Sequence, residues 1–483
     1  MNAHHLPVFR LILSILGFKM QKPLLSTVLK ALMALLVVTA TFAAPANADE
    51  TINLKVELPT STEMRITSDY EHVGKVLVIS EKDEKVQSLD LSVAAKLGYQ
   101  QRMLSSTQAM RTYDTAHATI TLNKKTAKPG LTKENDLVVA RTKPESQDVE
   151  MASVKGTLLH NELELIQNPA DPLTLCAVLN KEKIKLGDKW TPDPAALAKL
   201  VSASKVNESD VKLTLKSFDA KSARIFIAGS MSADVDDVST QMDVSGIAIV
   251  DRATNLPTSF KISIREIKQP GQISPGFDGT TKVDLRFTKV APSTKLSNTA
   301  LAAHTKTGKI RQRLKWVSRL GQFEMVYDQR WKMITEDEEA ALLRFIEKTE
   351  VLSQCQAVIL PKRPSDKPLT LDAYKKEISK IVEADKNAKF VKAKNKKSST
   401  GNTVMSVIVS GVEEGASVNW FYYNVARADG RQVAFVFTLD GSLADRVLPI
   451  ANQLVDEFEF KTPARKVAKS RTATTGKKPA KTR

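Results

Sequence analysis

The residues that could do chemistry are few and scattered along the chain. Four histidines follow position 48, and no two are close enough in sequence to form a local ligand pair: His72, His117, His160 and His304. We interpret each as a surface or strand residue. The motifs of phosphate-binding loops, dinucleotide folds, serine hydrolases and HExxH zinc proteases do not occur. The sequence therefore predicts no catalytic residue, no cofactor site and no metal site, and a hydrolase is the least favoured class of protein.

An acidic turn is the one candidate cation site. Asp234, Asp236 and Asp237 fall together between two predicted strands. Ca²⁺ takes about six to eight oxygen ligands, and its loops space the acids around a central glycine. That pattern is missing here. We therefore interpret the segment as a solvated hairpin turn, with Ca²⁺ binding as the alternative.

The chain has two cysteines, which are far apart in sequence. Cys176 and Cys355 each lie in an apolar run, LTLCAVL and LSQCQAVIL. A secreted protein could join them in a disulfide, but cysteines in apolar runs are commonly buried as free thiols. Two buried free thiols are the favoured prediction.

An aromatic hairpin is predicted near the C-terminus. Residues 417–427 and 431–439 form two apolar runs joined by an Asp429-Gly430 turn, and an Asp-Gly pair supplies the positive φ of a tight hairpin. One side of the hairpin must pack under the helix that follows, so core packing is favoured over a recognition platform. The aromatic residues concerned are Trp420, Phe421, Tyr422, Tyr423, Phe435 and Phe437.

The helix after the hairpin is predicted from a cap and an apolar periodicity. Ser442 is a good N-cap residue, and apolar residues recur at helical spacing as far as Phe458. The helix is expected to cover one face of the sheet that contains the hairpin. Residues 457–460 are predicted to form a short final strand.

Length and composition divide the chain into parts. With 483 residues, 42% hydrophobic and 26% charged, the chain is too long for one ordinary core. We expect two folded domains with tails. The predicted parts are a signal peptide at 1–48, a β-rich domain at 49–290, a linker at 291–313, a second domain at 314–460 and a disordered basic tail at 461–483.

The first 48 residues are predicted to be a targeting segment. Lys22 precedes an apolar run at 31–41, and Ala46-Asn47-Ala48 matches a small-x-small cleavage pattern. Met20 begins a complete signal of ordinary length and is predicted to be the true start. These features predict an extracytoplasmic protein, periplasmic or secreted. An uncleaved membrane anchor is the alternative, although the run is shorter than the roughly 20 residues that a span needs.

The net charge of +17 lies mainly outside the predicted domains. Residues 461–483 carry nine Lys or Arg and no acid, and residues 1–48 carry four and no acid, which leaves +4 for residues 49–460. The basic tail has three interpretations: a solvated extension, a tether to an anionic envelope polymer or membrane surface, and a nucleic-acid-binding tail, which secretion disfavours. A further lysine cluster at 386–397 is interpreted as a strand edge or loop that faces solvent.

The N-terminal half is predicted to be an antiparallel β domain, a curved meander or half-barrel. A helix at 195–203, with Asp193 as its cap, is expected against the concave side, and residues 171–179 are predicted to form a helical turn or two. This strand rhythm resembles the LolA-like periplasmic lipoprotein carriers, without a shared residue motif. Strands are predicted at 52–58, 63–67, 75–80, 85–94, 98–104, 110–122, 137–140, 158–166, 206–218, 223–233, 238–250, 258–267 and 281–290.

The C-terminal half is predicted to contain four strands, a helix at 370–384, four strands and the final helix. Tyr374, Ile378, Ile381 and Val382 are expected on the buried face of the first helix, and residues 336–346 fit either a strand or a helix. Three short motifs stand out: Phe323, Tyr327, Asp328, Arg330 and Trp331; Val407, Val409, Ser410 and Gly411; and Trp420, Tyr422 and Tyr423. In these motifs the half resembles the PsbP-like superfamily, which includes DcrB-type proteins. The resemblance implies an α/β/α sandwich around an antiparallel sheet and a role in binding or assembly, with no shared catalytic residues.

Together these features predict an α+β protein that is a non-catalytic binding or assembly module of the cell envelope. Its partner is expected to be another protein or an anionic envelope polymer, with a membrane surface as a further candidate for the tail and nucleic acid disfavoured. The alternative is a carrier of an apolar ligand such as a lipid, because a curved meander with a helix against it can enclose a pocket.

Overall fold

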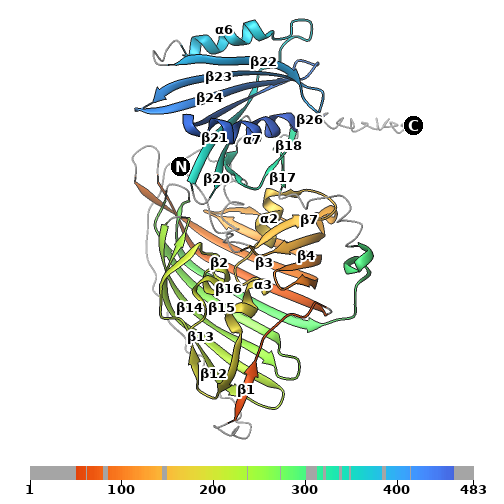
Figure 1. Cartoon of the computed structure of the whole chain (residues 1–483), viewed down its shortest axis with the longest axis vertical. Helices are drawn as coiled ribbons and strands as arrows, with labels where there is room; N and C mark the ends of the chain where they lie inside the picture. The colour runs from red at the N-terminus through yellow and green to blue at the C-terminus, as the bar shows by residue number, and fades with distance from the viewer. Residues whose placement is uncertain are drawn as a thin grey trace, which may run out of the picture.

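Most of the folded chain is antiparallel β-structure in open sheets. A sheet of seven strands lies at one end of the molecule and a larger sheet at the other (Figure 1). The predicted signal peptide, and the predicted tail after Lys461, lie outside the described residues. The computed structural model describes residues 50–60, 62–79, 85–143, 149–236, 238–271, 274–300, 313–318, 323–336, 340–347, 350–382, 388–413 and 415–461. Within these residues no helix has the length and apolar character needed to cross a membrane.

The larger sheet, called the large sheet below, has 13 strands and confirms the predicted meander. Its order is β10-β12-β13-β14-β15-β16-β2-β3-β4-β6-β7, with β11 paired to β13 and β5 to β4. The strands are β2 (Glu63–Ile79), β3 (Val86–Ser105), β4 (Gln108–Leu122), β5 (Lys125–Ala127), β6 (Leu137–Arg141), β7 (Glu150–Ser153), β10 (Lys189–Trp190), β11 (Lys205–Ser209), β12 (Lys212–Phe218), β13 (Ser222–Val235), β14 (Val238–Asp251), β15 (Leu256–Lys268) and β16 (Gly276–Lys289). A separate pair joins β1 (Thr51–Leu54) to β9 (Lys181–Lys185).

The first strands of the large sheet are longer than predicted. The separate strands expected at 63–67 and 75–80 are one 17-residue strand, β2, and those at 85–94 and 98–104 are one strand, β3. Gly74 lies in the gap that was predicted between the two strands, yet it is part of β2 and lies directly opposite Gly279 of β16. A Cβ atom at Gly74 would be 2.4 Å from the Asp278 carbonyl oxygen. The glycine therefore allows close backbone approach within a continuous strand.

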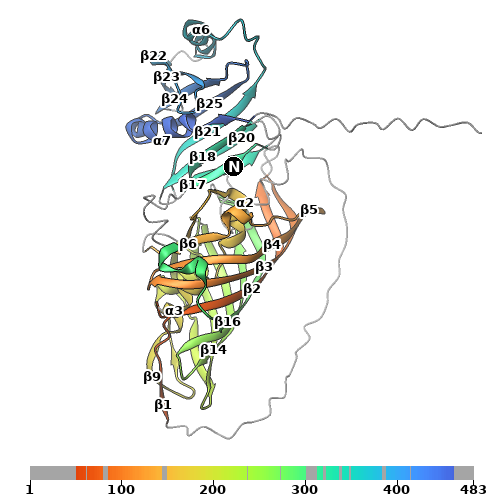
Figure 2. The same cartoon turned by 90° about the vertical axis from the view of Figure 1, so that its right-hand side faces the viewer.

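Three short helices pack on the concave face of the large sheet (Figures 1 and 2). They are α2 (His160–Ile166), α3 (Pro172–Leu179) and α4 (Pro194–Leu200). The predicted cap of α4 is confirmed, because the Asp193 carboxylate accepts a hydrogen bond from the Ala196 N–H at 2.9 Å. Asp171 caps α3 in the same way through the Leu173 N–H.

The strand predicted at 158–166 is wrong. Only β8 (Leu158–Leu159) is a strand, and the helix α2 begins at His160. The Glu162 side chain accepts a hydrogen bond from the Leu159 N–H at 2.9 Å and thereby satisfies a donor at the helix start. Leu163 and Ile166, three residues apart, are both buried. Local capping therefore outweighs the alternation of apolar residues in this segment.

The seven-stranded sheet confirms the predicted aromatic hairpin, formed by β24 and β25. Its order is β19-β20-β21-β25-β24-β23-β22, so residues 340–347 are a strand rather than a helix. The helices of this half are α6 (Leu371–Val382) and α7 (Ala444–Asp456). The strands are β19 (Trp331–Glu336), β20 (Ala340–Glu347), β21 (Glu350–Leu360), β22 (Lys389–Lys397), β23 (Thr403–Glu413), β24 (Ala416–Ala426) and β25 (Gln432–Asp440).

Two details of these helices differ from the sequence prediction. Ile381 is 56% exposed, whereas Tyr374, Ile378 and Val382 are buried as expected. Ser442 is not the cap of α7; it lies in a 3-10 turn, η3 (Gly441–Leu443), whose cap is the Asp440 carboxylate, which accepts a hydrogen bond from the Ser442 N–H at 2.8 Å. The charged Asp440 side chain precedes the whole turn and takes the capping position.

A small sheet joins the two halves of the chain. Its order is β26-β18-β17-β8, with β17 (Arg313–Val317), β18 (Phe323–Asp328) and β26 (Glu459–Phe460). The predicted final strand is thus present, but it pairs with β18 rather than with the hairpin. β17 pairs in parallel with β8 of the N-terminal half, and the Gln329 amide donates a hydrogen bond to the Met151 carbonyl at 2.9 Å. Backbone pairing therefore connects the halves directly.

Part of the predicted linker packs on the large sheet. Leu296, in the 3-10 turn η2 (Thr294–Leu296), is fully buried beside Met110 and Val139. The Lys295 ammonium lies 2.8 Å from the Asp136 carboxylate. Residues 301–312 lie outside the described residues.

Two glycines in hairpin turns of the seven-stranded sheet give a test of its packing. Gly430 and Gly401 have φ of +89° and +81°. A Cβ atom at Gly430 would be 1.9 Å from the Arg363 carbonyl oxygen, whereas Gly401 has open space. We expect Gly401→Ala to lower the free energy of unfolding by about 1–2 kcal/mol through backbone strain alone. Gly430→Ala should cost about 2–5 kcal/mol, because the clash is added. Urea unfolding followed by tryptophan fluorescence measures both, and equal losses would contradict the described turn.

Candidate functional site

Charged side chains are buried on the concave face of the large sheet. Side chains two residues apart in a strand share a face, so Glu266 and Lys268 of β15 point to the same side. His72 of β2 points inward as well. His72 is fully buried, Glu266 is 3% exposed and Lys268 is 1% exposed. Their strands are connected through β16, where Thr281 lies opposite His72 and Gly279 opposite Glu266. We call this group the histidine–lysine cluster.

His72 is held in its neutral form by its surroundings. Its Nδ1 atom is 2.7 Å from the Thr281 hydroxyl oxygen, and its ring stacks on Phe277 with centroids 4.1 Å apart. Burial, with a smaller contribution from the nearby Lys268 charge, lowers the pKa of His72 from 6.5 to about 3. His72 is therefore a neutral core residue at pH 7.

Lys268 is paired with an acid from the predicted cation site. Its Nζ atom lies 3.4 Å from an Asp236 carboxylate oxygen and 3.1 Å from the Ser274 hydroxyl. Both charged side chains are 1% exposed. The solvated-turn interpretation is thus wrong for Asp236, which turns inward at the end of β13 to neutralise a buried lysine. Asp234 is partly exposed and accepts a hydrogen bond from Asn207, while Asp237 lies outside the described residues.

Glu266 and Tyr70 complete the cluster, and burial raises the pKa of both. Burial is the main cause that raises the pKa of Glu266, against the lowering effects of Lys268 and Arg265. Burial likewise raises the pKa of Tyr70, which also lies near the carboxylates of Glu266 and Glu164. The raised pKa favours the uncharged form of Glu266, because a buried carboxylate without a close partner would be costly.

A second buried ion pair lies on the same face, between β4 and the start of α3. The guanidinium group of Arg111 donates two hydrogen bonds to Asp171, at 2.7 and 2.6 Å. Its Nε atom donates to the Gln101 side chain at 2.8 Å, and its plane lies 5.1 Å from the centre of the Tyr99 ring. The side chains of the pair are 1% and 6% exposed. Three N–H groups of the guanidinium are therefore hydrogen-bonded to buried polar side chains, two of them to one carboxylate.

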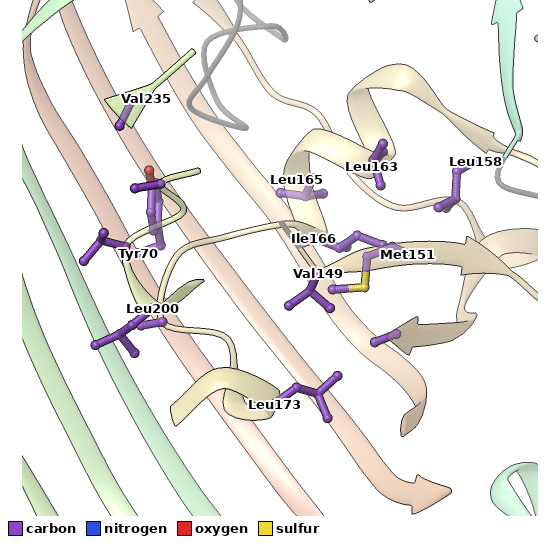
Figure 3. Close-up of a cluster of buried hydrophobic side chains, with 14 of the residues drawn as sticks. Tyr70, Val149, Met151, Leu158, Leu163, Leu165, Ile166, Leu173, Leu200 and Val235 are labelled. Carbon is purple, nitrogen blue, oxygen red and sulfur yellow. The ribbon is translucent and has the colours of Figure 1, made fainter. Parts of the chain in front are cut away.

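The chain's own side chains fill the space around these groups. Figure 3 shows Leu163 and Leu165 of α2, Leu173 of α3 and Leu200 of α4 gathered on the side of the large sheet to which Tyr70 points. All four leucines are at least 93% buried. Among the described residues no group of three or more His, Cys, Asp or Glu is placed to hold a metal ion. The buried polar groups thus act as cross-links of the core.

The remaining histidines are dispersed. His117 is exposed on β4, as expected for a strand residue at the surface. His160 is 9% exposed and begins α2, where its Nε2 atom is 3.7 Å from the Glu164 carboxylate. His304 lies outside the described residues. The structure therefore brings no two histidines of the described chain together.

The two cysteines are free thiols, as predicted. Cys355 is fully buried in β21, and Cys176 is partly buried in α3. Burial raises the pKa of Cys176 to about 12 and raises that of Cys355 as well. Both thiols are therefore protonated at neutral pH and lack the thiolate character of a nucleophile.

Core packing of the aromatic hairpin is confirmed. Phe421, Tyr423, Phe435 and Phe437 are at most 2% exposed, and the Tyr423 hydroxyl donates to the Asn452 side chain of α7 at 3.0 Å. On the other side of β24, Trp420 and Tyr422 pack with Tyr374, Ile378 and Val382 of α6. The alternation of the strand divides these side chains between the two helices.

The predicted lysine edge is also confirmed. β22 is the last strand of the seven-stranded sheet, and all its residues are exposed except the half-buried Ala393. It carries five lysines and no acid: Lys389, Lys392, Lys394, Lys396 and Lys397.

Comparisons with known proteins give remote likenesses. No family model and no curated protein matches the sequence. PsbP of Synechocystis sp. PCC 6803 is similar over 32% of this chain and 95% of its own, with 14% identity and a TM-score of 0.26. A Bacteroides thetaiotaomicron protein is similar over 31% and 49%, with 16% identity and a TM-score of 0.23. The type VI secretion immunity protein TplEi of Pseudomonas aeruginosa is similar over 45% and 74%, with 7% identity and a TM-score of 0.21.

These TM-scores are too low to carry an argument about what the chain does. A weak PsbP-like resemblance, which the C-terminal motifs predicted, is among them. The LolA-like resemblance stays a prediction.

The sequence contained one signal for the histidine–lysine cluster that the motif search did not use. In β15, Phe260, Ile262 and Ile264 are buried at every second position, and Glu266 and Lys268 continue that series. Charged residues at inward positions of a strand must be paired or neutralised. Asp236, the partner of Lys268, could not be found from this alternation, because a positive φ of 57° at the turn places its side chain.

The Arg111–Asp171 pair should be essential for stability. Arg111→Met leaves the Asp171 carboxylate buried and unpaired, and we expect a loss of about 3–5 kcal/mol in the free energy of unfolding. The matched control is Arg65→Met, which removes the solvent-exposed ion pair with Asp114 and should cost less than about 1 kcal/mol. Urea unfolding at neutral pH measures both variants. Similar losses would show that the Arg111 pair is not buried.

His72 should make stability depend on pH in the acid range. Its folded pKa is below the unfolded value of 6.5, so the unfolded chain binds more protons and stability falls as pH falls from 6.5 toward about 3. From pH 6.5 to pH 5 the His72 contribution is a loss of at most about 2 kcal/mol. The double variant His72→Phe, Thr281→Val keeps the ring stack on Phe277 and removes the titrating group. Unfolding free energies at both pH values should show a smaller loss in the variant; an equal loss would contradict the assignment.

Proposed function

We propose that the protein is an extracytoplasmic, non-catalytic binding or assembly protein of the cell envelope. The observation that carries the proposal is the division of its charged groups. On the concave face, Arg111 pairs with Asp171 and Lys268 pairs with Asp236 in the core, whereas a lysine-rich edge strand is exposed at one end. Such a distribution supports contact with an anionic partner rather than a reaction at an enclosed site.

The C-terminal half is proposed to be a PsbP-like α/β/α unit. Support comes from α6 and α7, which contact opposite sides of β24 through Tyr422 and Tyr423 respectively. The proposed unit spans residues 314–460, and the proposed β-rich domain spans residues 49–290. The mixed sheet of β8, β17, β18 and β26 would hold them in a fixed arrangement.

The extracytoplasmic location rests on the sequence. The apolar run at 31–41 and the cleavage pattern Ala46-Asn47-Ala48 support secretion. Free thiols are compatible with an oxidising compartment, because the two cysteines lie in different halves of the chain, in α3 and β21, and do not pair with each other.

A carrier role for the N-terminal half has less support. The helices α2, α3 and α4 bring apolar side chains onto the concave face, where a lipid would have to lie. A hollow of about 420 Å³ near Asp69 and Lys261 is on the opposite, outer face. Native mass spectrometry that shows lipid retained by the full chain would favour the carrier over the binding module.

The basic tail gives the test of the proposed function. Residue Lys461 is held by the Glu324 carboxylate at 2.7 Å, so the deletion should begin at position 462 and spare this contact. Residues 462–483 have the composition of a segment without a core, and their removal should leave the thermal unfolding temperature unchanged. The same deletion should remove most of the affinity for long-chain polyphosphate at low salt, because it removes eight of the nine positive charges of residues 461–483.

Affinity can be measured by fluorescence titration at several salt concentrations. The control is a chain in which residues 462–483 keep their length but carry Gln in place of each Lys and Arg. If the full chain fails to bind polyphosphate, the polymer-binding role is lost. If the deletion binds as well as the full chain, the tail is a solvated extension and the polymer binds elsewhere on the chain.

A further inference from the structure

Four of the β22 lysines lie on one face of the strand. Directly opposite residues of an antiparallel pair point to the same side of a sheet. Lys392, Lys394 and Lys396 lie opposite Ile408, Ser406 and Val404 of β23. The intervening residues of β23, Met405 and Val407, pack under α6. The three lysines therefore point away from α6.

Lys389 belongs to the same row. It lies opposite Ser410, while its neighbour Phe390 lies opposite Val409, which packs under α6. The register shift between Phe390 and Lys392 marks a bulge at Val391. A bulge adds one residue without reversing the faces that follow its shifted register. Lys389, Lys392, Lys394 and Lys396 thus form a row, called the lysine row below.

The length and charge of the lysine row can be stated from strand geometry. Lysines two residues apart are separated by about 6.6 Å along a strand, and the whole row extends over about 20 Å. In the part of the chain that the structure describes, Lys396 is the member paired with an acid, at 3.0 Å from Asp456 at the end of α7. The side chains of Ser406 and Ser410, both half-buried, lie next to the row on β23.

We propose that the lysine row is a binding track for an extended anionic polymer with repeating phosphate groups. This inference rests on the proposed function and names the surface and the partner class. Charge complementarity is the argument: evenly spaced ammonium groups on a rigid strand can face successive charges of a linear polyanion, and hydroxyl groups beside them can donate hydrogen bonds to phosphate oxygens.

A protective role for the row is the competing explanation. Lysines on edge strands prevent sheet-to-sheet association, and a single inward lysine is enough for that purpose. Four lysines on one face add a continuous positive potential that edge protection does not require. The two explanations differ in what happens to polyanion binding when the row is neutralised.

The test uses the full chain and long-chain polyphosphate as the probe. The row variant carries Lys389→Gln, Lys392→Gln and Lys394→Gln, and it spares the paired Lys396. The matched control carries Lys375→Gln, Lys376→Gln and Lys380→Gln on α6. These three lysines are also exposed, and their substitution removes the same amount of charge. Both variants should unfold at the parent's urea concentration, because the substituted side chains are exposed.

The readout is the slope of the logarithm of the binding constant against the logarithm of salt concentration. Each lysine–phosphate contact contributes about 0.7 to this slope for a single-stranded polyanion, so the row variant should lose about two and the α6 control should keep the parent slope. Equal slopes for the row variant and the parent, or equal losses in both variants, overturn the proposal.

The membrane surface is distinguished by a second arm. If the row variant keeps its polyphosphate slope but no longer co-sediments with phosphatidylglycerol vesicles, the row faces a membrane and the polymer proposal fails. The tail deletion reports separately on the proposed function. If the parent chain binds polyphosphate through residues 462–483 alone, the proposed function stands and only the lysine-row proposal fails.

Discussion

The large sheet depends on one constraint: every charge on its concave face must be neutralised inside the protein. Arg111 and Lys268 are among the largest fully buried side chains, and each meets an acid from a turn or helix start rather than from a neighbouring strand. Asp171 stands before α3, and Asp236 stands at the end of β13. The buried charges therefore fix where a helix and a hairpin turn are placed against the sheet. An unpaired ion in this position would cost several kcal/mol.

The same constraint explains why the concave face differs from the surface. Inside, each buried positive charge has one specific acid, and the neutral His72 and Glu266, whose pKa is raised by burial, lie beside the Lys268 pair. Outside, β22 carries five lysines, and the one acid that pairs with the lysine row in the described chain is Asp456. The buried charges of the large sheet are thus neutralised inside the protein, whereas the lysines of β22 are exposed to solvent. This division is the physical basis of the proposed binding role.

Much of the fold was predictable from local pattern. The period of two in residues 223–267 and the Asp429-Gly430 turn predicted the meander and the hairpin, and Asp193 before Pro194 predicted the start of α4. The helix α2 was missed because its cap is the side chain of Glu162, whose effect depends on a single hydrogen bond. The gap predicted between residues 67 and 75 was wrong, because Gly74 allows close approach of Asp278 and Gly279, about two hundred residues away. The buried partners of Arg111 and Lys268 were hidden for the same reason, since sequence spacing does not show which turn reaches a given strand.

The pairing of β2 with β16 has a consequence for how the chain reaches its structure. His72 and Thr281 touch, although they are 209 positions apart. Closing a loop of that length costs conformational entropy, and the contacts that offset this cost form only afterwards. Sheets built from distant segments therefore form slowly. During synthesis β2 and β3 emerge long before β16, so one side of β2 stays unpaired until residue 289 is available. The nascent N-terminal half therefore exposes an open strand edge for most of its synthesis, and it is a natural client for chaperones that hold chains apart.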